Sequence, residues 1–174
     1  MDWLTRHVDL LPVHGRALDV ACGRGRHALW LAERGLDTVA VDRDAEAVQA
    51  VQHEARRRGL DVDARVQDLE TDHASLGDAL YDVIVVVHYL HRPLFPALVR
   101  ALRPGGLLIY ETFTRAQAAR GKPTNPAFLL ESGELPTLVA PLEILRAREG
   151  DYEGRFVASV VAMAPSTAVA VTRK

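Results

Sequence analysis

The sequence has a single cysteine, Cys22, among 174 residues. No disulfide can form within the chain, and a reducing compartment, the cytoplasm, is therefore expected. The formal net charge is only −2, which argues against a nucleic-acid or membrane-surface partner, because both require a basic patch. Long apolar runs are missing as well, since residues 83–87 form one of the longest and a membrane-spanning helix needs roughly 20. The first eleven residues carry four ionisable side chains, which excludes a signal peptide there.

Two apolar periods alternate along the chain. Hydrophobic residues make up 48 % of the sequence, which is enough for the core of one domain over residues 1–174. Short apolar runs predict strands, and apolar residues at helical spacing predict helices between them. The predicted strands cover residues 17–21, 38–41, 62–66, 83–87 and 107–113. The predicted helical segments lie between Arg26 and Gly35, between Asp44 and Gly59, over residues 73–80 and over residues 94–102.

The last third of the sequence changes character. Residues 114–135 hold two prolines and two glycines and predict a long, mostly structureless loop, in which Asn125-Pro126-x-Phe128 is expected to contact a ligand. Residues 142–147 and 156–163 predict two strands, which must pair antiparallel because residues 148–155 are too few for a crossover helix. Residues 168–174 predict either a frayed tail or a short edge segment. Five β-α units and this hairpin indicate a largely parallel sheet with helices on both faces. A ligand is expected at the carboxyl ends of the strands, where the strand order reverses.

The main chemical signal lies between Asp19 and Ala28, where a strand gives way to a helix. Gly23 and Gly25 allow a tight turn whose backbone N–H groups can face a ligand. Taken alone, Gly23-x-Gly25-x-x-Ala28 also fits a dinucleotide fingerprint or a purely structural turn. Asp19 favours a different ligand, because a carboxylate beside the turn would repel a pyrophosphate and attract an ammonium group.

Two further acids follow the next two strands. Asp42 ends the second strand, where a carboxylate can accept hydrogen bonds from both hydroxyls of an adenosine ribose. Asp68 follows the third strand and is suited to the exocyclic amine of an adenine, with Leu69 against the ring face. Together with Asp19, these residues indicate a nucleoside that carries a free ammonium group.

Several segments carry a family resemblance. Asp19-Val20-Ala21-Cys22-Gly23-x-Gly25 resembles the first motif of class I S-adenosylmethionine-dependent methyltransferases. Asp42, Gln67-Asp68-Leu69 and Arg103-Pro104-Gly105-Gly106 are similar to later motifs of that family. The resemblance spans about residues 17–163 and implies a Rossmann-like α/β fold: a doubly wound, seven-stranded, mostly parallel sheet with a C-terminal antiparallel hairpin, in three layers. Gly23-x-Gly25-Arg26 and Glu111-Thr112-Phe113 further resemble small bacterial enzymes of the tellurite-resistance and thiopurine types.

The resemblance implies S-adenosylmethionine as the cofactor and S-adenosylhomocysteine as the product. Ala21 departs from the family pattern, which has glycine there; the change is mild if Ala21 keeps a negative φ. Cys22 is expected to pack as a small apolar side chain, with a reactive thiolate as the alternative. The candidate cofactor-binding residues are Asp19, Ala21, Cys22, Gly23, Gly25, Arg26, Asp42, Arg43, Asp68, Leu69 and His88.

In the resembled family, the end of the fourth strand faces the transferred methyl group. The candidate catalytic residues are therefore His88, Tyr89 and His91, joined by Glu111 from the fifth strand, while Arg92 and Tyr110 could contact the acceptor. His88 and His91 lack a third ligand at a suitable spacing, so no metal is expected. A soft acceptor such as a thiolate would need no base, whereas a less acidic acceptor would need one of these candidates.

The predicted activity is methyl transfer to a small molecule by a monomer or homodimer. An Asn-Pro-Pro-Tyr type motif is absent, which argues against methylation of DNA amino groups. One alternative is a partner protein that binds S-adenosylmethionine without catalysis. The other is an oxidoreductase that uses NAD or FAD, against which Asp19 and the closing hairpin both count.

Overall fold

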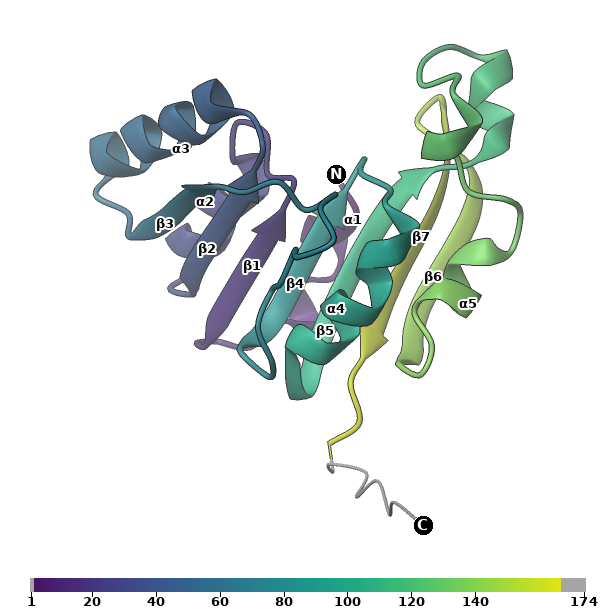
Figure 1. The fold of residues 1–174 in the computed structure, drawn as a ribbon. Coiled ribbons are helices and arrows are strands. Elements are labelled where there is room, and N and C mark those ends of the chain that lie inside the picture. The colour runs from purple at the N-terminus through teal and green to yellow at the C-terminus, as the bar shows by residue number, and fades with distance from the viewer. Residues whose placement is uncertain (1, 167–174) are drawn as a thin grey trace.

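The computed structural model describes residues 2–166, which form one seven-stranded sheet. The strands are β1 (Arg16–Val20), β2 (Asp37–Asp42), β3 (Val62–Val66), β4 (Tyr81–Val87), β5 (Leu102–Phe113), β6 (Glu143–Tyr152) and β7 (Arg155–Met163). They lie in the order β3-β2-β1-β4-β5-β7-β6 (Figure 1). Neighbours from β3 to β5 are parallel, whereas β7 is antiparallel to β5 and β6. The predicted doubly wound sheet with a C-terminal hairpin is confirmed.

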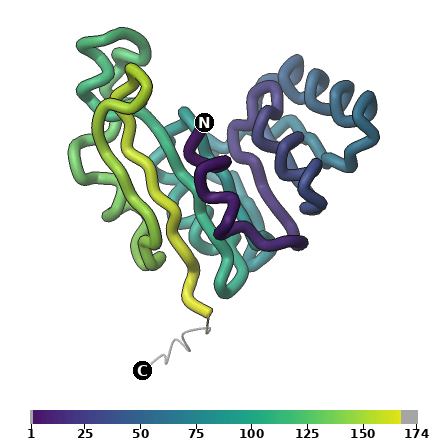
Figure 2. Tube along the Cα trace, turned by 180° about the vertical axis from the view of Figure 1, so that it is seen from behind, coloured from purple at the N-terminus to yellow at the C-terminus, as the bar shows by residue number. Residues whose placement is uncertain are grey.

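Helices cover both faces of this sheet, as predicted. The helices α1 (Trp3–Arg6), α2 (Arg26–Glu33) and α3 (Ala45–Arg58) lie on one face; α1 crosses the front of the sheet in Figure 2. The opposite face carries α4 (Phe95–Ala101) and α5 (Glu134–Leu138), which lie in front of the sheet in Figure 1. Val83 of β4 packs in the same cluster as Leu31, whereas the next residue, Ile84, packs in the cluster of Leu98. Because β4 is buried on both faces, its run of apolar residues is continuous.

The helix α3 shows how local sequence sets an element's limits. Asp44 caps its start, and the carboxylate accepts a hydrogen bond from the backbone N–H of Glu46 at 2.9 Å. Gly59 ends the helix in the left-handed conformation with a φ of +67°. The basic run before it lies in the last turn, where cations complement the helix dipole. In the described part of the chain, no helix is long and apolar enough to cross a membrane.

The predicted helix over residues 73–80 is wrong. Residues 67–80 contain no helix, and Gly77 adopts a φ of +81°. The Ser75 hydroxyl accepts a hydrogen bond from the Gly77 backbone N–H at 3.2 Å, so the side chain stabilises a turn in place of a helical backbone. Leu69 and Leu76 from this connection are buried in the core cluster that also contains Ile84 and Leu98. The connection therefore covers the sheet without forming a helix.

The predicted boundaries around Arg103-Pro104-Gly105-Gly106 are also wrong. The helix ends at Ala101, and Leu102 already pairs with Tyr81 in the sheet. The register between β4 and β5 then shifts, so the Pro-Gly-Gly segment forms an irregularity inside β5 instead of a separate turn. A side chain at Gly106 would approach the Tyr81 carbonyl oxygen to 2.9 Å, which explains the need for glycine.

Residues 114–135 are not structureless, contrary to the prediction. They contain the 3-10 helices η3 (Arg115–Ala119) and η4 (Pro126–Phe128) and the start of α5. Leu129, Leu130 and Leu135 are buried, and the Leu130 backbone N–H donates to the Phe113 carbonyl at 2.9 Å. Arg92, in the 3-10 helix η2 (Arg92–Leu94), donates to both carboxylate oxygens of Glu134, at 2.5 and 3.0 Å. Long-range packing therefore orders a segment that has no periodic sequence pattern.

The closing hairpin is longer than predicted. β6 and β7 pair over most of residues 148–155 and are joined by a two-residue turn at Glu153 and Gly154, whose φ values are +55° and +80°. Positive φ at both turn residues matches the twist of two antiparallel strands. The tail or edge segment predicted at 168–174 lies outside the described residues.

Candidate functional site

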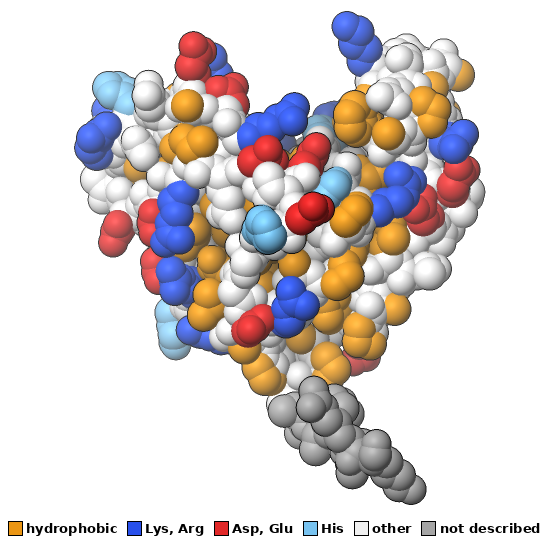
Figure 3. Space-filling model, in the orientation of Figure 1, with side chains coloured by type: hydrophobic (Ala, Val, Ile, Leu, Met, Phe, Trp, Pro, Cys, Tyr) orange, Lys and Arg blue, Asp and Glu red, His pale blue; other side chains and the backbone are white. Residues whose placement is uncertain are grey.

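A cavity of about 710 Å³ opens at the carboxyl ends of the parallel strands. It lies where the strand order reverses between β1 and β4, as the sequence predicted. In Figure 3 the hollow appears at the upper edge of the molecule, with charged side chains gathered on one side and hydrophobic ones on the other. The lining residues come from the ends of five strands, β1 to β5, and from the segment after β5: Ala21, Asp42, Arg43, Gln67, Asp68, Leu69, Glu70, His88, Tyr89, Leu90, Thr112, Phe113, Lys122, Pro123, Thr124, Asn125 and Phe128.

The turn between β1 and α2 borders the main cavity at the end of β1. Ala21 has a φ of +52°, so the condition under which its departure from glycine would be mild is not met. The left-handed conformation costs a residue with a Cβ about 1–2 kcal/mol, and the turn imposes it because the next residue, Cys22, donates its N–H to the Val41 carbonyl at 3.0 Å. A Cβ at Gly23 would meet nothing within 4 Å, whereas one at Gly25 would meet Val51 Cγ2 at 2.6 Å. Gly25 is therefore required for packing against α3, and Gly23 leaves open space in front of the turn.

Asp42 connects this turn to the end of β2. Its Oδ2 accepts a hydrogen bond from the Gly23 N–H at 2.8 Å, and its Oδ1 accepts one from the Asp44 N–H at 2.9 Å. Each oxygen keeps one lone pair, so the carboxylate can still accept two hydrogen bonds from the cavity. At the end of β3, Asp68 accepts from the Glu70 N–H at 2.9 Å, and Leu69 beside it is buried. The two acids and the apolar side chain all line the main cavity.

Two predicted cofactor residues lie behind the turn. Asp19 is 2 % exposed and lines neither cavity; its Oδ2 accepts a hydrogen bond from the Ala28 backbone N–H at 2.9 Å. Burial raises the pKa of this carboxyl to about 6. Cys22 packs against the small cluster of β2, β3 and α3 residues, and burial raises the pKa of its thiol, so a reactive thiolate is disfavoured.

His88 follows β4 in the middle of the cavity. Its φ is +57°, a conformation in which histidine is enriched relative to most residues. The backbone N–H of His88 donates to the Glu111 carbonyl at 2.8 Å, and the imidazole stacks on Phe113 with 4.5 Å between ring centroids. Burial lowers the pKa of His88, so the ring is neutral near pH 7. Next to it, the Tyr89 hydroxyl donates to Glu70 at 3.4 Å, and burial raises the pKa of that phenol.

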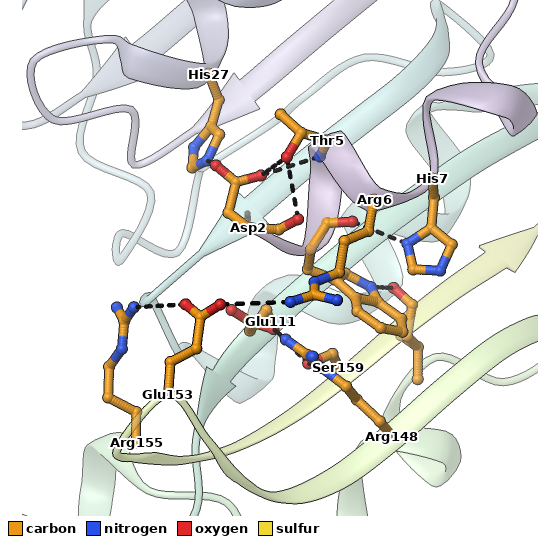
Figure 4. A network of polar contacts seen from close by, with 12 residues as sticks. Asp2, Thr5, Arg6, His7, His27, Glu111, Arg148, Glu153, Arg155 and Ser159 are labelled. Atoms are coloured by element: carbon orange, nitrogen blue, oxygen red, sulfur yellow. Dashed lines mark hydrogen bonds and ion pairs between the residues drawn. The ribbon is translucent and has the colours of Figure 1, made fainter.

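A second, charged chamber of about 130 Å³ lies on the other side of His88. Figure 4 shows the polar contacts around it, and two groups of these contacts concern the site. In one, Asp2 lies within 3.3 Å of His27 Nε2 and 3.4 Å of Arg26, and the His27 hydrogen bond lowers the pKa of Asp2. In the other, Glu111 accepts from Ser159 at 2.5 Å and from Arg148 at 3.0 Å. The chamber is lined by Asp2, Arg26, Val87, His88, Glu111, Arg148, Tyr152, Glu153, Arg155 and Val157.

Comparison with known proteins decides the family. The methyltransferase domain family matches residues 17–106, more than half of the chain, and these residues include the turn, Asp42, Asp68 and His88. The chain belongs to this methyltransferase family. Its fold is that of the class I S-adenosylmethionine-dependent methyltransferases, and S-adenosylmethionine is the cofactor.

Individual relatives support the assignment of this chain to the methyltransferase family. A curated ubiquinone biosynthesis O-methyltransferase of Xanthomonas axonopodis is 35 % identical over 115 residues, which are 63 % of this chain and 48 % of that protein. The chain spans about half the length of the curated relatives that it matches. Among solved structures, TehB from Haemophilus influenzae aligns with a TM-score of 0.75 at 19 % identity, over 92 % of this chain and 61 % of that one. The [4+2]-cyclase SpnF aligns with a TM-score of 0.75 at 20 % identity, over 94 % and 80 %.

The residues present fit S-adenosylmethionine. Gly23 leaves open space, since an added Cβ there would meet no atom within 4 Å, and Asp42 keeps free lone pairs beside it. The mixed charge of the smaller chamber suits the ammonium and carboxylate of an amino acid. In the described residues, no group of three or more His, Cys, Asp or Glu side chains is arranged to hold a metal ion.

The methyltransferase fold separates the predicted catalytic residues. His88 and Tyr89 line the main cavity, but the lining of neither cavity includes His91. Glu111 faces the smaller chamber and is paired, which removes the problem of an isolated buried carboxylate. The expected acceptor contacts of two further residues are contradicted. Arg92 is held by Glu134, and the buried Tyr110 donates its hydroxyl to the Tyr89 carbonyl at 2.6 Å.

Sequence reasoning missed Asp2 and Arg148. Glu111, Ser159 and Arg148 form one cross-strand row of β5, β7 and β6. An acid in an apolar strand signals the need for a partner, but the register of the hairpin is required to find which one. Asp2 reaches the chamber only because α1 folds back over the sheet, and no local pattern in the sequence indicates that.

Proposed function

We propose that this chain transfers the methyl group of S-adenosylmethionine to a small-molecule acceptor and releases S-adenosylhomocysteine. One observation carries the proposal: a single cavity runs from the acids at the ends of β2 and β3, past His88, to the apolar wall around Phe128. Its volume of about 710 Å³ lies within the roughly 300–1,000 Å³ of small-molecule sites and must accommodate both reactants. The net charge of −2 supports a small acceptor over a nucleic acid.

The cofactor would lie across the switch point. Asp42 is suited to the ribose hydroxyls, and Asp68 with Leu69 to the adenine. Arg26 is suited to the methionine carboxylate and Asp2 to the ammonium group, because both line the smaller chamber next to His88. We assign Asp19 a positioning role, since its carboxylate holds the start of α2 through Ala28.

His88 is our candidate for the group that handles a proton. The bound cofactor supplies an electrophilic methyl group on a sulfonium, and transfer needs an acceptor atom in line with it. His88 borders both cavities, and its lowered pKa keeps the imidazole free to accept a proton from an O–H or S–H acceptor. The stacking on Phe113 fixes the plane of the ring. An acceptor that is already anionic would need no base and would need only to be held in line with the methyl group.

The names of the curated relatives bear on the acceptor atom. The ubiquinone biosynthesis enzymes are O-methyltransferases, which makes an oxygen acceptor a candidate beside a soft acceptor such as a thiolate. We place the reaction in the cytoplasm, on the basis of the single free cysteine. A monomer or a homodimer is consistent with the proposal.

A second candidate function is binding of S-adenosylmethionine without methyl transfer. The similarity to SpnF, a cyclase, favours considering it, because the same fold serves another reaction there. Incubation with methyl-labelled S-adenosylmethionine and a panel of phenols, thiols and amines separates the two. Formation of S-adenosylhomocysteine that depends on an acceptor and is lost in Asp42→Ala supports catalysis. Tight cofactor binding with no acceptor-dependent turnover across the panel would contradict it.

A further inference from the structure

Lys122 holds an unusual place at the mouth of the main cavity. It is the only lysine among residues 2–166, in a chain whose other cationic side chains there are arginines or histidines. Within residues 2–166, no carboxylate lies within 4.0 Å of its ammonium group. Its backbone is fixed by Gln117, which is 6 % exposed, donates to the Lys122 carbonyl at 3.2 Å and accepts from the Phe156 N–H at 2.9 Å. The lysine is thus held at the cavity without a partner of opposite charge.

Charge is distributed unevenly around this cavity. Asp42 ends β2, and Asp68 and Glu70 follow β3; with Arg43, they line the side of the cavity that we assign to the cofactor, the cofactor wall. The opposite wall, formed by the end of β5 and the segment after it, has only uncharged side chains besides Lys122. Arg92 adds no free positive charge there, because Glu134 neutralises it. A ligand on the opposite wall therefore meets one positive charge and no negative one.

The same wall presents flat apolar surface. Phe113, Pro123 and Phe128 line it, and Phe128 is 49 % exposed, which is high for a phenylalanine. The backbone of Phe128 belongs to η4, which Asn125 caps by accepting a hydrogen bond from the Ala127 N–H at 3.0 Å. An exposed aromatic ring on a fixed backbone is suited to stacking on a planar ligand.

We infer that the acceptor is a small aromatic molecule that carries one carboxylate, with its ring against Phe113 and Phe128 and its carboxylate on Lys122. A single ammonium group matches a single negative charge, and lysine acts as a point charge that does not require a bidentate partner. This inference rests on the proposed function, since it names the substrate class of that site. His88, between this wall and the cofactor wall, is then the residue next to the atom that receives the methyl group.

Binding of a matched pair of probes tests the inference without the need to know the acceptor atom. Calorimetry in the presence of saturating S-adenosylhomocysteine compares 4-hydroxybenzoate with 4-hydroxybenzamide, which have the same ring and differ in charge. We expect the carboxylate to bind at least about tenfold more tightly, the low end for a charge-assisted hydrogen bond. Lys122→Met should remove the preference by weakening only the carboxylate, and Lys122→Arg should retain most of it. Arg120→Met, which removes a neighbouring cation that is paired with Asp151, should leave the preference intact.

The proposed function and the inference about the acceptor are contradicted by different results. Absence of S-adenosylhomocysteine binding contradicts the proposed function itself. If S-adenosylhomocysteine binds but the two probes bind equally, or neither binds, the inference about the acceptor is overturned while the proposed function stands. An unchanged preference in Lys122→Met would also overturn it, because the carboxylate would then be recognised elsewhere.

Discussion

The Asp42 carboxylate accepts a hydrogen bond from the Gly23 backbone N–H at 2.8 Å, which joins the end of β2 to the turn after β1. The same carboxylate faces the main cavity. One side chain therefore both holds the shape of the cofactor turn and remains available to a ligand. The geometry couples the local stability of the turn to the affinity for the cofactor.

Asp42→Ala is expected to weaken binding of S-adenosylhomocysteine by roughly tenfold to 150-fold, the effect of losing one charge-assisted hydrogen bond. It should also lower the Tm, because the N–H groups of Gly23 and Asp44 lose their acceptor. Asp44→Ala is the matched control: it removes the cap of α3, costs about 1 kcal/mol of stability and leaves the affinity unchanged. Calorimetry and thermal unfolding on both variants separate the two effects. Equal affinities in Asp42→Ala and the wild type would refute the ribose assignment.

His88→Asn is expected to reduce kcat by about 10²–10⁴-fold with a protic acceptor, with little change in cofactor affinity. Asparagine tolerates the left-handed backbone at this position, so the fold should survive. The base must be neutral, and burial lowers the pKa of His88 from its ordinary value of 6.5, so the wild-type rate should fall on the acid side with a midpoint below pH 6.5. That acid limb should disappear in His88→Asn. His91→Asn should behave as the wild type, because His91 lines neither cavity; a larger loss there than in His88→Asn would reverse the assignment.

Asp19 should give the protein a measurable pH dependence of stability. Burial raises its pKa in the folded state from 3.8 to about 6, so the carboxyl contributes stability below about pH 4 that is lost as the pH rises through 6. That rise in pKa corresponds to about 3 kcal/mol. From pH 4 to pH 7 the wild type should therefore lose up to this much of its free energy of unfolding relative to Asp19→Asn, because asparagine does not titrate. Denaturant unfolding across that range measures it, and a constant difference between the two proteins would show that Asp19 does not titrate as described.

Hydrogen exchange should divide residues 114–135 into two parts. The Leu130 amide, which is bonded to the Phe113 carbonyl and fully buried, should be protected without ligands. The amides of the exposed residues Lys122, Thr124 and Asn125 should exchange quickly and slow down only when cofactor and acceptor are both bound, since these residues line the cavity. Mass spectrometry of peptides from this segment, with and without ligands, distinguishes the two. Uniform fast exchange would instead support one long mobile loop.

Much of the fold could be predicted from the sequence because local patterns determine where its helices and strands form. The strand β4 is indicated by its continuous β-branched run. The limits of α3 are indicated by the capping residues at its two ends. The acids after β2 and β3 were found for a related reason: topology alone brings the carboxyl ends of parallel strands to one edge.

What the sequence did not reveal depends on long-range packing. The order in residues 114–135 comes from three buried leucines and from the Arg92–Glu134 pair, and the pairing of Glu111 with Arg148 comes from the register of a hairpin. The positive φ of Ala21 is imposed by the turn around it and is opposite to what alanine favours. His91 was predicted at the site because the family resemblance places the end of the fourth strand at the methyl group, but His91 lines neither cavity.

The most direct test of the account is calorimetric titration of the purified chain with S-adenosylhomocysteine and, separately, with NAD. The account predicts saturable binding of S-adenosylhomocysteine at one site per chain, weakened in Asp42→Ala, and no measurable binding of NAD. A mixed-charge chamber suits an amino acid end, and the buried Asp19 disfavours a pyrophosphate beside the turn. Tighter binding of NAD than of S-adenosylhomocysteine would contradict the assignment of this cavity to S-adenosylmethionine.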